Sequence, residues 1–397
     1  MANISSEAVR PVVSAVNSRG GRSARAWLPV LWIPLVLGVI FTGLFWGGGR
    51  LAGLLDTAWR LHASPPLGAA VRAILGNGIA ARVVLWGVDA GLNAVLSVAI
   101  PYVLTFYLIL ALLQESGILG HVTAAADDLL VRTGLTATAS LPLVIGAGCN
   151  VPAILSLRGL RTETERVVAG TLVTLVPCSA RTAVVFGTVG YVLGWIWALG
   201  LYALVAAVII ASGHGLRRIF PGVRPPARPA PALRRPALRP VAVTLWAHLR
   251  EFVLGAAPFV LAGSVVLGGL YETGLIAGAA GPLAPLVEGW LRLPPAAGLT
   301  LIFAVLRKEL ALQLLMAMAA MSGAGGGGIR ELMSPAQIFT YALVNTIAVP
   351  CTATIGVLAR TVGGRRAAAI AGSTLVLALL LGGIAARMLA ATAAWPR

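Results

Sequence analysis

The sequence predicts an all-α polytopic membrane protein made of two similar halves with interrupted helices, with roughly 8–10 transmembrane or re-entrant helices in total. Three observations predict this fold class. Hydrophobic residues make up 58% of the 397 residues and charged residues 11%, and the mean hydropathy is +0.91, whereas about a quarter of the residues in soluble domains are charged. Several apolar stretches reach the roughly 20 residues that a helix needs to cross a bilayer. Breaks that contain proline and cysteine recur in both halves.

The positive charge is concentrated in two arginine-rich segments. The formal net charge is +17, and the arginines cluster in residues 1–25 and 214–240. By the positive-inside rule we expect both segments on the cytoplasmic side of the membrane. No folded basic face or interleaved aromatic pattern is visible, so we expect no nucleic-acid partner. The first apolar run begins near Ala26 and is long enough to remain as a span rather than act as a cleaved signal peptide.

The apolar stretches predict the order of the spans. Between Ala80 and Gly117 the sequence is apolar but interrupted by Asp89, Asn93 and Pro101, which indicates either one kinked helix or two helices that meet near Pro101. Residues 214–240 are rich in proline and arginine without helical periodicity, which predicts a linker between the halves. The clearest spans are Trp27–Trp46, Ala183–Ala211, Phe252–Leu270 and Ala367–Ala391.

Three breaks in the apolar sequence hold all three cysteines. They are Gly146–Pro152 with Cys149, Leu175–Thr182 with Cys178, and Ala348–Ile355 with Cys351. The last two share Val-Pro-Cys, a hydroxyl residue and alanine, so they match as parts of a repeat. The helix before the third break is predicted to begin at Ser334-Pro335, a capping residue followed by proline.

A fourth interruption lies in the second half, at Arg307-Lys308-Glu309. It corresponds to the first break only if the second half carries extra residues, for which the glycine-rich loop Gly323–Gly328 is a natural place. Two halves with interrupted helices in corresponding positions point to a transporter with its site near the middle of the membrane.

The breaks bring together groups that suit a transition metal. Each proline removes a backbone donor, so carbonyls near Val173–Leu175 and Thr346–Ile347 lose their helical partners. Irregular backbone inside a membrane is tolerated only where it packs in protein or lines a polar cavity. Thiolates prefer Fe(II), Zn(II) and Cu(I), and amide, hydroxyl and carbonyl oxygens extend the site toward harder ions. The candidate metal ligands are Cys149, Asn150, Cys178, Cys351 and Glu309, and the candidate pathway residues are Ser179, Thr352, Asp89, Glu115 and Asn345.

Each candidate also has a structural interpretation. A single membrane cysteine is usually a small buried apolar residue, and Asp89 and Glu115 could pair helices. Glu309 could form an interfacial pair with Arg307, with Lys308, the only lysine, reaching the head groups. The four histidines are scattered without metal-ligand spacing. We expect four arginines to be anchors at the cytoplasmic face rather than ligands: Arg158, Arg161, Arg166 and Arg181.

Several motifs resemble the membrane, or gate-repeat, domain of the bacterial ferrous iron transport protein B family. They are LPLVIGAGCNVPAI (Leu141–Ile154), PCSAR (Pro177–Arg181), LRKELA (Leu306–Ala311), VPCTAT (Val349–Thr354) and, upstream, LQESGILG (Leu113–Gly120). The resemblance runs from about Ala80 to the carboxyl terminus. It implies a helical transporter with two gate repeats, related in fold to nucleoside transporters. The family's metal-path cysteines match Cys149, Cys178 and Cys351, its first-gate asparagine matches Asn150, and its second-gate glutamate matches Glu309.

The composition and the breaks predict a domain organisation, and the resemblance implies the kind of membrane. We expect a disordered basic arm (1–25), a first membrane half (26–213) with gate 1 (141–182), the linker (214–240), and a second half (241–397) with gate 2 (301–361). The protein would lie in the bacterial inner membrane with the arm and linker in the cytoplasm. It would be a transporter of Fe(II) or a similar divalent metal, not an enzyme, without a permanently bound cofactor.

The sequence departs from the family in ways that affect energy coupling. The family's GTPase needs a phosphate-binding loop, and none occurs here. Flux would therefore follow the gradient or membrane potential, or need a separate GTPase or small regulatory protein in trans; a homo-oligomer is a further expectation. The first gate also reads Pro-Cys-Ser-Ala-Arg instead of the usual Ser-Cys-Gly-Ala-Arg. Two alternatives stay open: a permease for an organic solute such as a nucleoside, and a non-transporting membrane scaffold.

Overall fold

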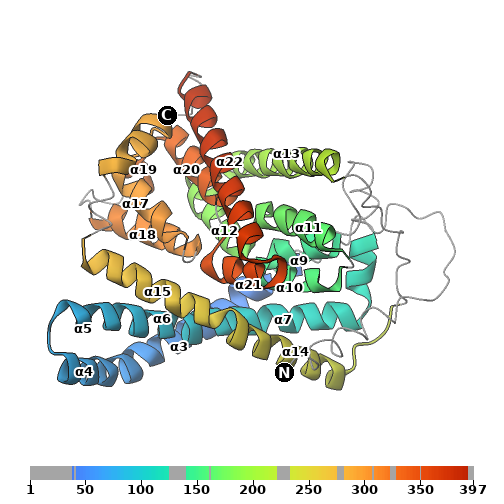
Figure 1. Cartoon of the computed structure of the whole chain (residues 1–397), viewed down its shortest axis with the longest axis horizontal. Helices are drawn as coiled ribbons and strands as arrows, with labels where there is room; N and C mark the ends of the chain where they lie inside the picture. Colours follow the sequence, from blue (N-terminus) through green and yellow to red (C-terminus); the bar gives the residue numbers. More distant parts are fainter. Residues whose placement is uncertain are drawn as a thin grey trace. The chain divides into compact units, whose positions relative to one another are not determined.

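The computed structural model describes residues 38–39, 42–124, 140–160, 162–220, 233–274, 281–305, 308–321, 328–348 and 350–391. Every regular element in these ranges is a helix (Figure 1), so the predicted fold class is confirmed. Six helical stretches there are long and apolar enough to cross a membrane, and a shorter apolar helix covers Leu310–Ala319. The six are Ile79–Glu115, Glu163–Gly190, Trp195–Ile219, Leu238–Leu270, Pro335–Val362 and Gly364–Ala390.

Some sequence predictions fall outside the described residues. These are the arm 1–25, most of the first span Trp27–Trp46, the centre of the linker 214–240, and all but the last residue of the glycine-rich loop. The described ends of the linker are helical, because α13 (Trp195–Ile219) runs into it and α14 (Leu238–Gly255) begins inside it. Residues 214–219 and 238–240 of the predicted linker are therefore helical, although the sequence shows no helical periodicity there.

The chain forms two compact units, each composed of separate stretches. Unit 1 takes the described residues within Met1–Leu67, Leu92–Val173 and Ile210–Pro258, and unit 2 those within Gly68–Gly91, Thr174–Ile209 and Phe259–Arg397. Each unit therefore combines segments from both sequence halves. The repeat of two halves remains a prediction about the sequence.

Unit 1 is built on the packing of α7 (Ile100–Glu115) against α14 and η1, and of α9 (Ser140–Gly148) against α10 (Asn150–Ser156). Asn93 Nδ2 donates to Asp56 Oδ1 at 2.7 Å, which ties the segment before α7 to α3. The other helices with at least half of their residues in unit 1 are η1 (Gly43–Gly48), α3 (Gly49–Ala58), η2 (Trp59–Ala63), α6 (Ala90–Asn93), η4 (Ala94–Ala99), η6 (Leu157–Gly159) and α11 (Glu163–Leu175).

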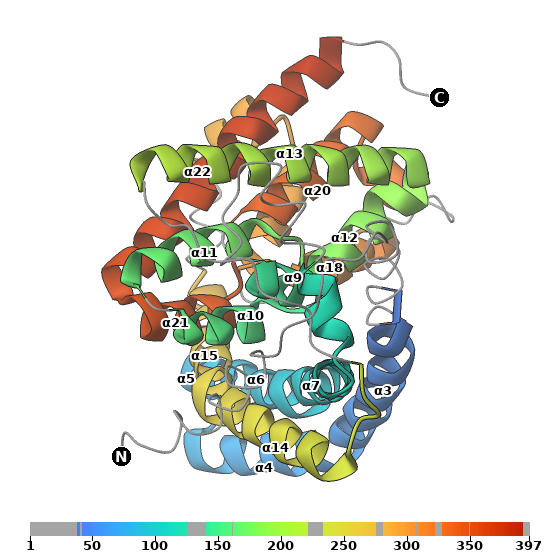
Figure 2. The same cartoon turned by 90° about the vertical axis from the view of Figure 1, so that its right-hand side faces the viewer.

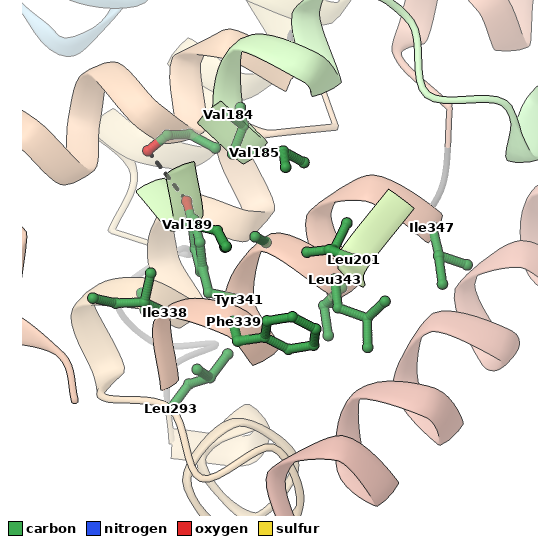
Figure 3. Packing of buried hydrophobic residues seen from close by; sticks show 14 of the residues in the cluster. Val184, Val185, Val189, Leu201, Leu293, Ile338, Phe339, Tyr341, Leu343 and Ile347 are labelled. Carbon is green, nitrogen blue, oxygen red and sulfur yellow. Dashed lines mark hydrogen bonds between the residues drawn. The ribbon is translucent and has the colours of Figure 1, made fainter. Parts of the chain in front are cut away.

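Unit 2 has a large apolar core. Labelled side chains from α12 (Ser179–Val185), η7 (Phe186–Gly190), α13 and α20 (Pro335–Ile347) gather there (Figure 3). Inside this core Thr300 Oγ1 and Tyr341 Oη are hydrogen bonded at 2.8 Å. α20 also packs along α22 (Gly364–Ala391) (Figure 2), where a side chain at Gly382 would meet Val344. The remaining helices are α4 (Ser64–Leu75), α5 (Ile79–Val84), η3 (Leu85–Asp89), α15 (Ala257–Glu272), η8 (Pro285–Trp290), α17 (Pro295–Phe303), α18 (Lys308–Met321), α19 (Ile329–Leu332) and α21 (Thr352–Val362).

Two predictions about helix ends are confirmed and one is wrong. Ile79–Glu115 is one helical stretch, and the π-helical segment η4 ends at Ala99, two residues before Pro101, where a wider turn accommodates the missing N–H. Ser334 caps α20 in a capping box with Gln337, and Pro335 is its first residue. The predicted single span Ala183–Ala211 is instead two helices, because the chain turns at Gly194, whose φ of 99° favours glycine.

Candidate functional site

Each of the three cysteines occupies the N-cap position of the helix that follows a break, without a capping hydrogen bond involving its side chain. Cys149 directly precedes α10, Cys178 precedes α12, and Cys351 precedes α21. All three have extended backbone conformations, are half-buried and lie outside any disulfide. The predicted breaks are therefore confirmed, and each places a cysteine at a helix amino terminus. Cys149 belongs to unit 1, and Cys178 and Cys351 belong to unit 2.

The prolines explain where these helices stop and start. The residue before a proline avoids the α conformation, and α11 ends at Leu175, two residues before Pro177. Pro152 is the third residue of α10, where the first N–H groups have no partner in the helix, so the proline costs no hydrogen bond. The sequence thus forms the breaks by local chemistry alone.

In unit 2, Arg181 takes the carbonyl groups that the two Pro-Cys breaks release. Its Nη1 donates to the Thr174 oxygen at 2.6 Å and to the Val176 oxygen at 3.2 Å. Its Nη2 donates to the Ala348 oxygen at 3.2 Å. The residue is 1% exposed. One guanidinium therefore ties the break before α12 to the break before α21.

Lys308 is a second buried cation on the same carbonyl. Its Nζ lies 3.3 Å from the Ala348 oxygen, and the residue is 3% exposed. Both cations lie close enough to Cys178 and Cys351 to interact with them electrostatically. The Thr352 amide donates to the Val305 oxygen at 3.0 Å, so the break between α17 and α18 also joins this cluster.

These two cations correct the sequence interpretation. Arg181 is not a cytoplasmic-face anchor and Lys308 does not reach the head groups, because both side chains are buried among backbone carbonyls. The carbonyls near Val173–Leu175 are predicted to lose their helical partners, and among them the Thr174 oxygen accepts a hydrogen bond from Arg181. A signal was available: buried carbonyls need donors, and Arg181 is the nearest charged donor in the sequence.

In unit 1, the first break lies against an aromatic pair. A side chain at Gly148 would collide with the Phe106 ring, which explains the glycine before Cys149. Tyr107 interacts electrostatically with Cys149 and stacks on His248, with ring centroids 4.6 Å apart and planes 6° apart. Tyr107 Oη and Asn150 Oδ1 are both buried and have no hydrogen-bond partner in the described part of the chain. Sequence spacing missed Tyr107 and His248, because they come from distant helices.

The remaining predicted residues are placed as follows. Ser179 begins α12 and is half-buried, as is Asp89 in η3. Glu115 pairs with Arg234 at 3.0 Å at the end of α7. Asn345, in α20, is 0% exposed, and neither its Oδ1 nor its Nδ2 finds a partner among the described residues. The Glu309 side chain lies outside what the structure describes.

No described group of three or more His, Cys, Asp or Glu side chains converges as a metal-binding cluster. In unit 2 the candidate sulfur ligands are Cys178 and Cys351, and backbone carbonyls and two cations accompany them. Such a set contrasts with the closed four-ligand cages of structural zinc sites.

The fold and these breaks define a polytopic helical membrane protein with interrupted helices. The family model described as "Gate: Nucleoside recognition" matches residues 96–192 and 253–365. The chain belongs to the Gate family. The match covers all four interruptions, including those that hold the three cysteines.

Similar proteins include curated iron transporters. The chain is 29% identical to the Fe(2+) transporter FeoB of Synechocystis sp. over 354 residues, which are 83% of this chain and 56% of the relative. It is 25% identical to the Fe(2+) transporter FeoB of Staphylococcus aureus over 305 residues, 68% of this chain and 43% of the relative. The resemblance to this family's membrane domain is confirmed. The chain spans about half the length of these relatives.

Solved structures of the transporter CNTnw also align over most of the chain. The inward-facing, substrate-bound state covers 97% of this chain and 95% of that one, at 15% identity and a TM-score of 0.44. An outward-facing variant aligns at 13% identity and the same TM-score of 0.44, covering 99% of this chain and 97% of that one.

Proposed function

We propose that this chain forms the membrane path of a divalent-metal transporter, with Fe(II) as its cargo. The observation that carries the proposal is the position of the cysteines. Every cysteine in the protein occupies the N-cap position of a helix at a break in the apolar sequence. The curated relatives are Fe(2+) transporters. Cysteine sulfur suits transition metals such as iron, whereas Mg²⁺ and Ca²⁺ take oxygen ligands.

The proposed path uses weak, successive ligand sets. A permeating ion must bind well enough to leave water and weakly enough to move on. Cys178 and Cys351 with nearby carbonyls in unit 2, and Cys149 with Asn150 in unit 1, are incomplete sites of this kind, and Glu309 is a further proposed ligand. Ser179, Thr352, Asp89, Glu115 and Asn345 remain proposed pathway residues. Incomplete ligand sets suit transit better than permanent binding.

The setting of the path is also a proposal. We place it in the bacterial inner membrane, with the arginine-rich arm and linker on the cytoplasmic side. Its proposed partners are the lipid bilayer, a separate GTPase or small regulatory protein in trans, and further copies of the chain.

A second candidate cargo is an organic solute such as a nucleoside. The observation that favours it is Asn345, whose buried amide lacks a partner at both polar atoms in the described part of the chain. Amide groups recognise planar solutes by paired hydrogen bonds. The family description names nucleoside recognition as well.

Uptake into proteoliposomes distinguishes the two cargoes. The purified chain is expected to take up Fe(II) under anaerobic conditions, saturably and above protein-free vesicles, and to leave labelled uridine outside. Uridine uptake without Fe(II) uptake would assign the path to the organic solute instead. Uptake of neither would favour a scaffold.

Tyr107→Phe tests whether the unpartnered hydroxyl in unit 1 serves the cargo. A buried hydroxyl without a partner costs roughly 1–3 kcal/mol, so its removal should leave the thermal midpoint unchanged or raise it. If the hydroxyl contacts the ion, Fe(II) uptake should fall several-fold in the same variant. Tyr191→Phe is the control, because Tyr191 is 81% exposed. Wild-type uptake by Tyr107→Phe would remove Tyr107 from the path.

A further inference from the structure

The position of Lys308 in unit 2 is unfavourable for the stability of the folded protein. An ammonium has three donors, but the one hydrogen bond that the described residues give it is a 3.3 Å contact with the Ala348 oxygen. It is also the first residue of the 14-residue helix α18, where the helix dipole disfavours a positive charge. The residue is 3% exposed and forms no ion pair among the described residues, so its burial adds a further cost. These three costs make Lys308 easy to displace.

Arg181 shares the Ala348 oxygen but is held far more firmly. It donates to two other carbonyls, those of Thr174 and Val176. Its planar group matches this arrangement, whereas the Lys308 ammonium is a point charge on a flexible stem. If one of the two cations leaves the cluster, it is therefore Lys308.

We propose that Lys308 is an internal cation that holds the Ala348 carbonyl beside Cys178 and Cys351 until an entering divalent metal ion displaces it. The proposal rests on the proposed metal path and adds an exchange step to it. A divalent ion beside two buried cations would meet strong repulsion at low dielectric. Departure of Lys308 removes part of this repulsion and frees one acceptor position of the Ala348 oxygen, which keeps its hydrogen bond from Arg181.

The exchange also gives the path a basis for selectivity. A sodium or magnesium ion would gain mainly the carbonyl oxygen that Lys308 already fills. A transition metal gains bonds to cysteine sulfur in addition, and the thiol protons leave to water as those bonds form. Only an ion that prefers sulfur would therefore displace Lys308. Without metal, the ammonium keeps the buried carbonyl hydrogen bonded.

The single lysine of the chain makes the exchange directly measurable. The full chain in detergent, kept anaerobic, is treated with an amine-acylating reagent, and mass spectrometry follows modification of Lys308 against that of the α-amino group. Lys308 should react slowly without metal, about fivefold or more faster with Fe(II), and at the metal-free rate with Mg²⁺. Cys351→Ser should abolish the acceleration by Fe(II), measured as the ratio of the rates with and without metal in the same variant.

Uptake by the same purified chain, reconstituted into proteoliposomes, separates the possible failures. Fe(II) uptake with an unchanged Lys308 reaction rate would overturn the exchange and leave the metal path standing. Absence of both uptake and acceleration would overturn the two together. Lys308→Met gives a second readout: without the competing cation, half-maximal uptake should occur at a severalfold lower Fe(II) concentration, whereas Lys308→Arg should not lower it. An unchanged or higher concentration for Lys308→Met would contradict the exchange.

Discussion

Replacing Arg181 with methionine is expected to destabilise the protein by about 3–5 kcal/mol and to abolish transport. The change removes a buried charge, which is favourable in itself, but it takes the Arg181 donor from the Thr174 and Val176 oxygens and leaves the Ala348 oxygen with the weaker Lys308 contact. Each unsatisfied buried acceptor costs roughly 1–3 kcal/mol, so the loss should exceed the gain. The measurement is the thermal midpoint of the detergent-solubilised protein, together with Fe(II) uptake.

Two further variants identify the cause of that loss. Arg181→Lys keeps the charge but cannot reach three carbonyls, so it should fall between wild type and Arg181→Met. Arg365→Met, at an exposed position of α22 in the same unit, should change stability by less than about 0.5 kcal/mol. Wild-type stability of Arg181→Met would contradict the assignment of Arg181 as the tie between the breaks.

Serine in place of each cysteine is expected to reduce Fe(II) uptake about tenfold or more, because oxygen replaces a sulfur ligand of similar size. Folding should be little affected, because a half-buried cap position accepts serine well. Fe(II) uptake by Cys149→Ser, Cys178→Ser and Cys351→Ser is compared with that of wild type in proteoliposomes. The thermal midpoint of each variant is measured first, to establish that it folds like the wild type. Wild-type flux in all three would refute a path through the thiols.

The interruptions could be predicted from the sequence because their causes are local. Pro177 and Pro152 limit the backbone conformations of their neighbours, and Ser334 caps its own helix. Hydropathy likewise identified α22 and the membrane part of α15. It did not detect the turn at Gly194, because the residues on both sides are equally apolar and only the backbone angle marks the end of the helix.

The roles of Arg181 and Lys308 could not be obtained in the same way. Arg181 donates to an oxygen 167 residues further along the chain. Hydropathy predicts which segments span the membrane but not which of them pack against each other, so this contact could not be predicted. The stacking of Tyr107 on His248 has the same origin, because α7 and α14 are distant in sequence and adjacent in unit 1. The sequence alone therefore favours a surface anchor for each charged residue in an apolar segment. In the structure, Arg181 and Lys308 instead donate to backbone carbonyls at the breaks.

Sulfur coordination by the capping cysteines is most directly tested with cobalt(II), which substitutes for ferrous iron in sites with nitrogen, oxygen and sulfur ligands. A thiolate bound to cobalt(II) gives an intense near-ultraviolet charge-transfer absorption that oxygen ligands do not give. Titration of the purified chain should produce this band, and it should weaken in Cys149→Ser and in Cys178→Ser and disappear when all three cysteines are replaced. Absence of the band in the wild-type protein, or a band unchanged by all three substitutions, would contradict a metal path through the cysteines.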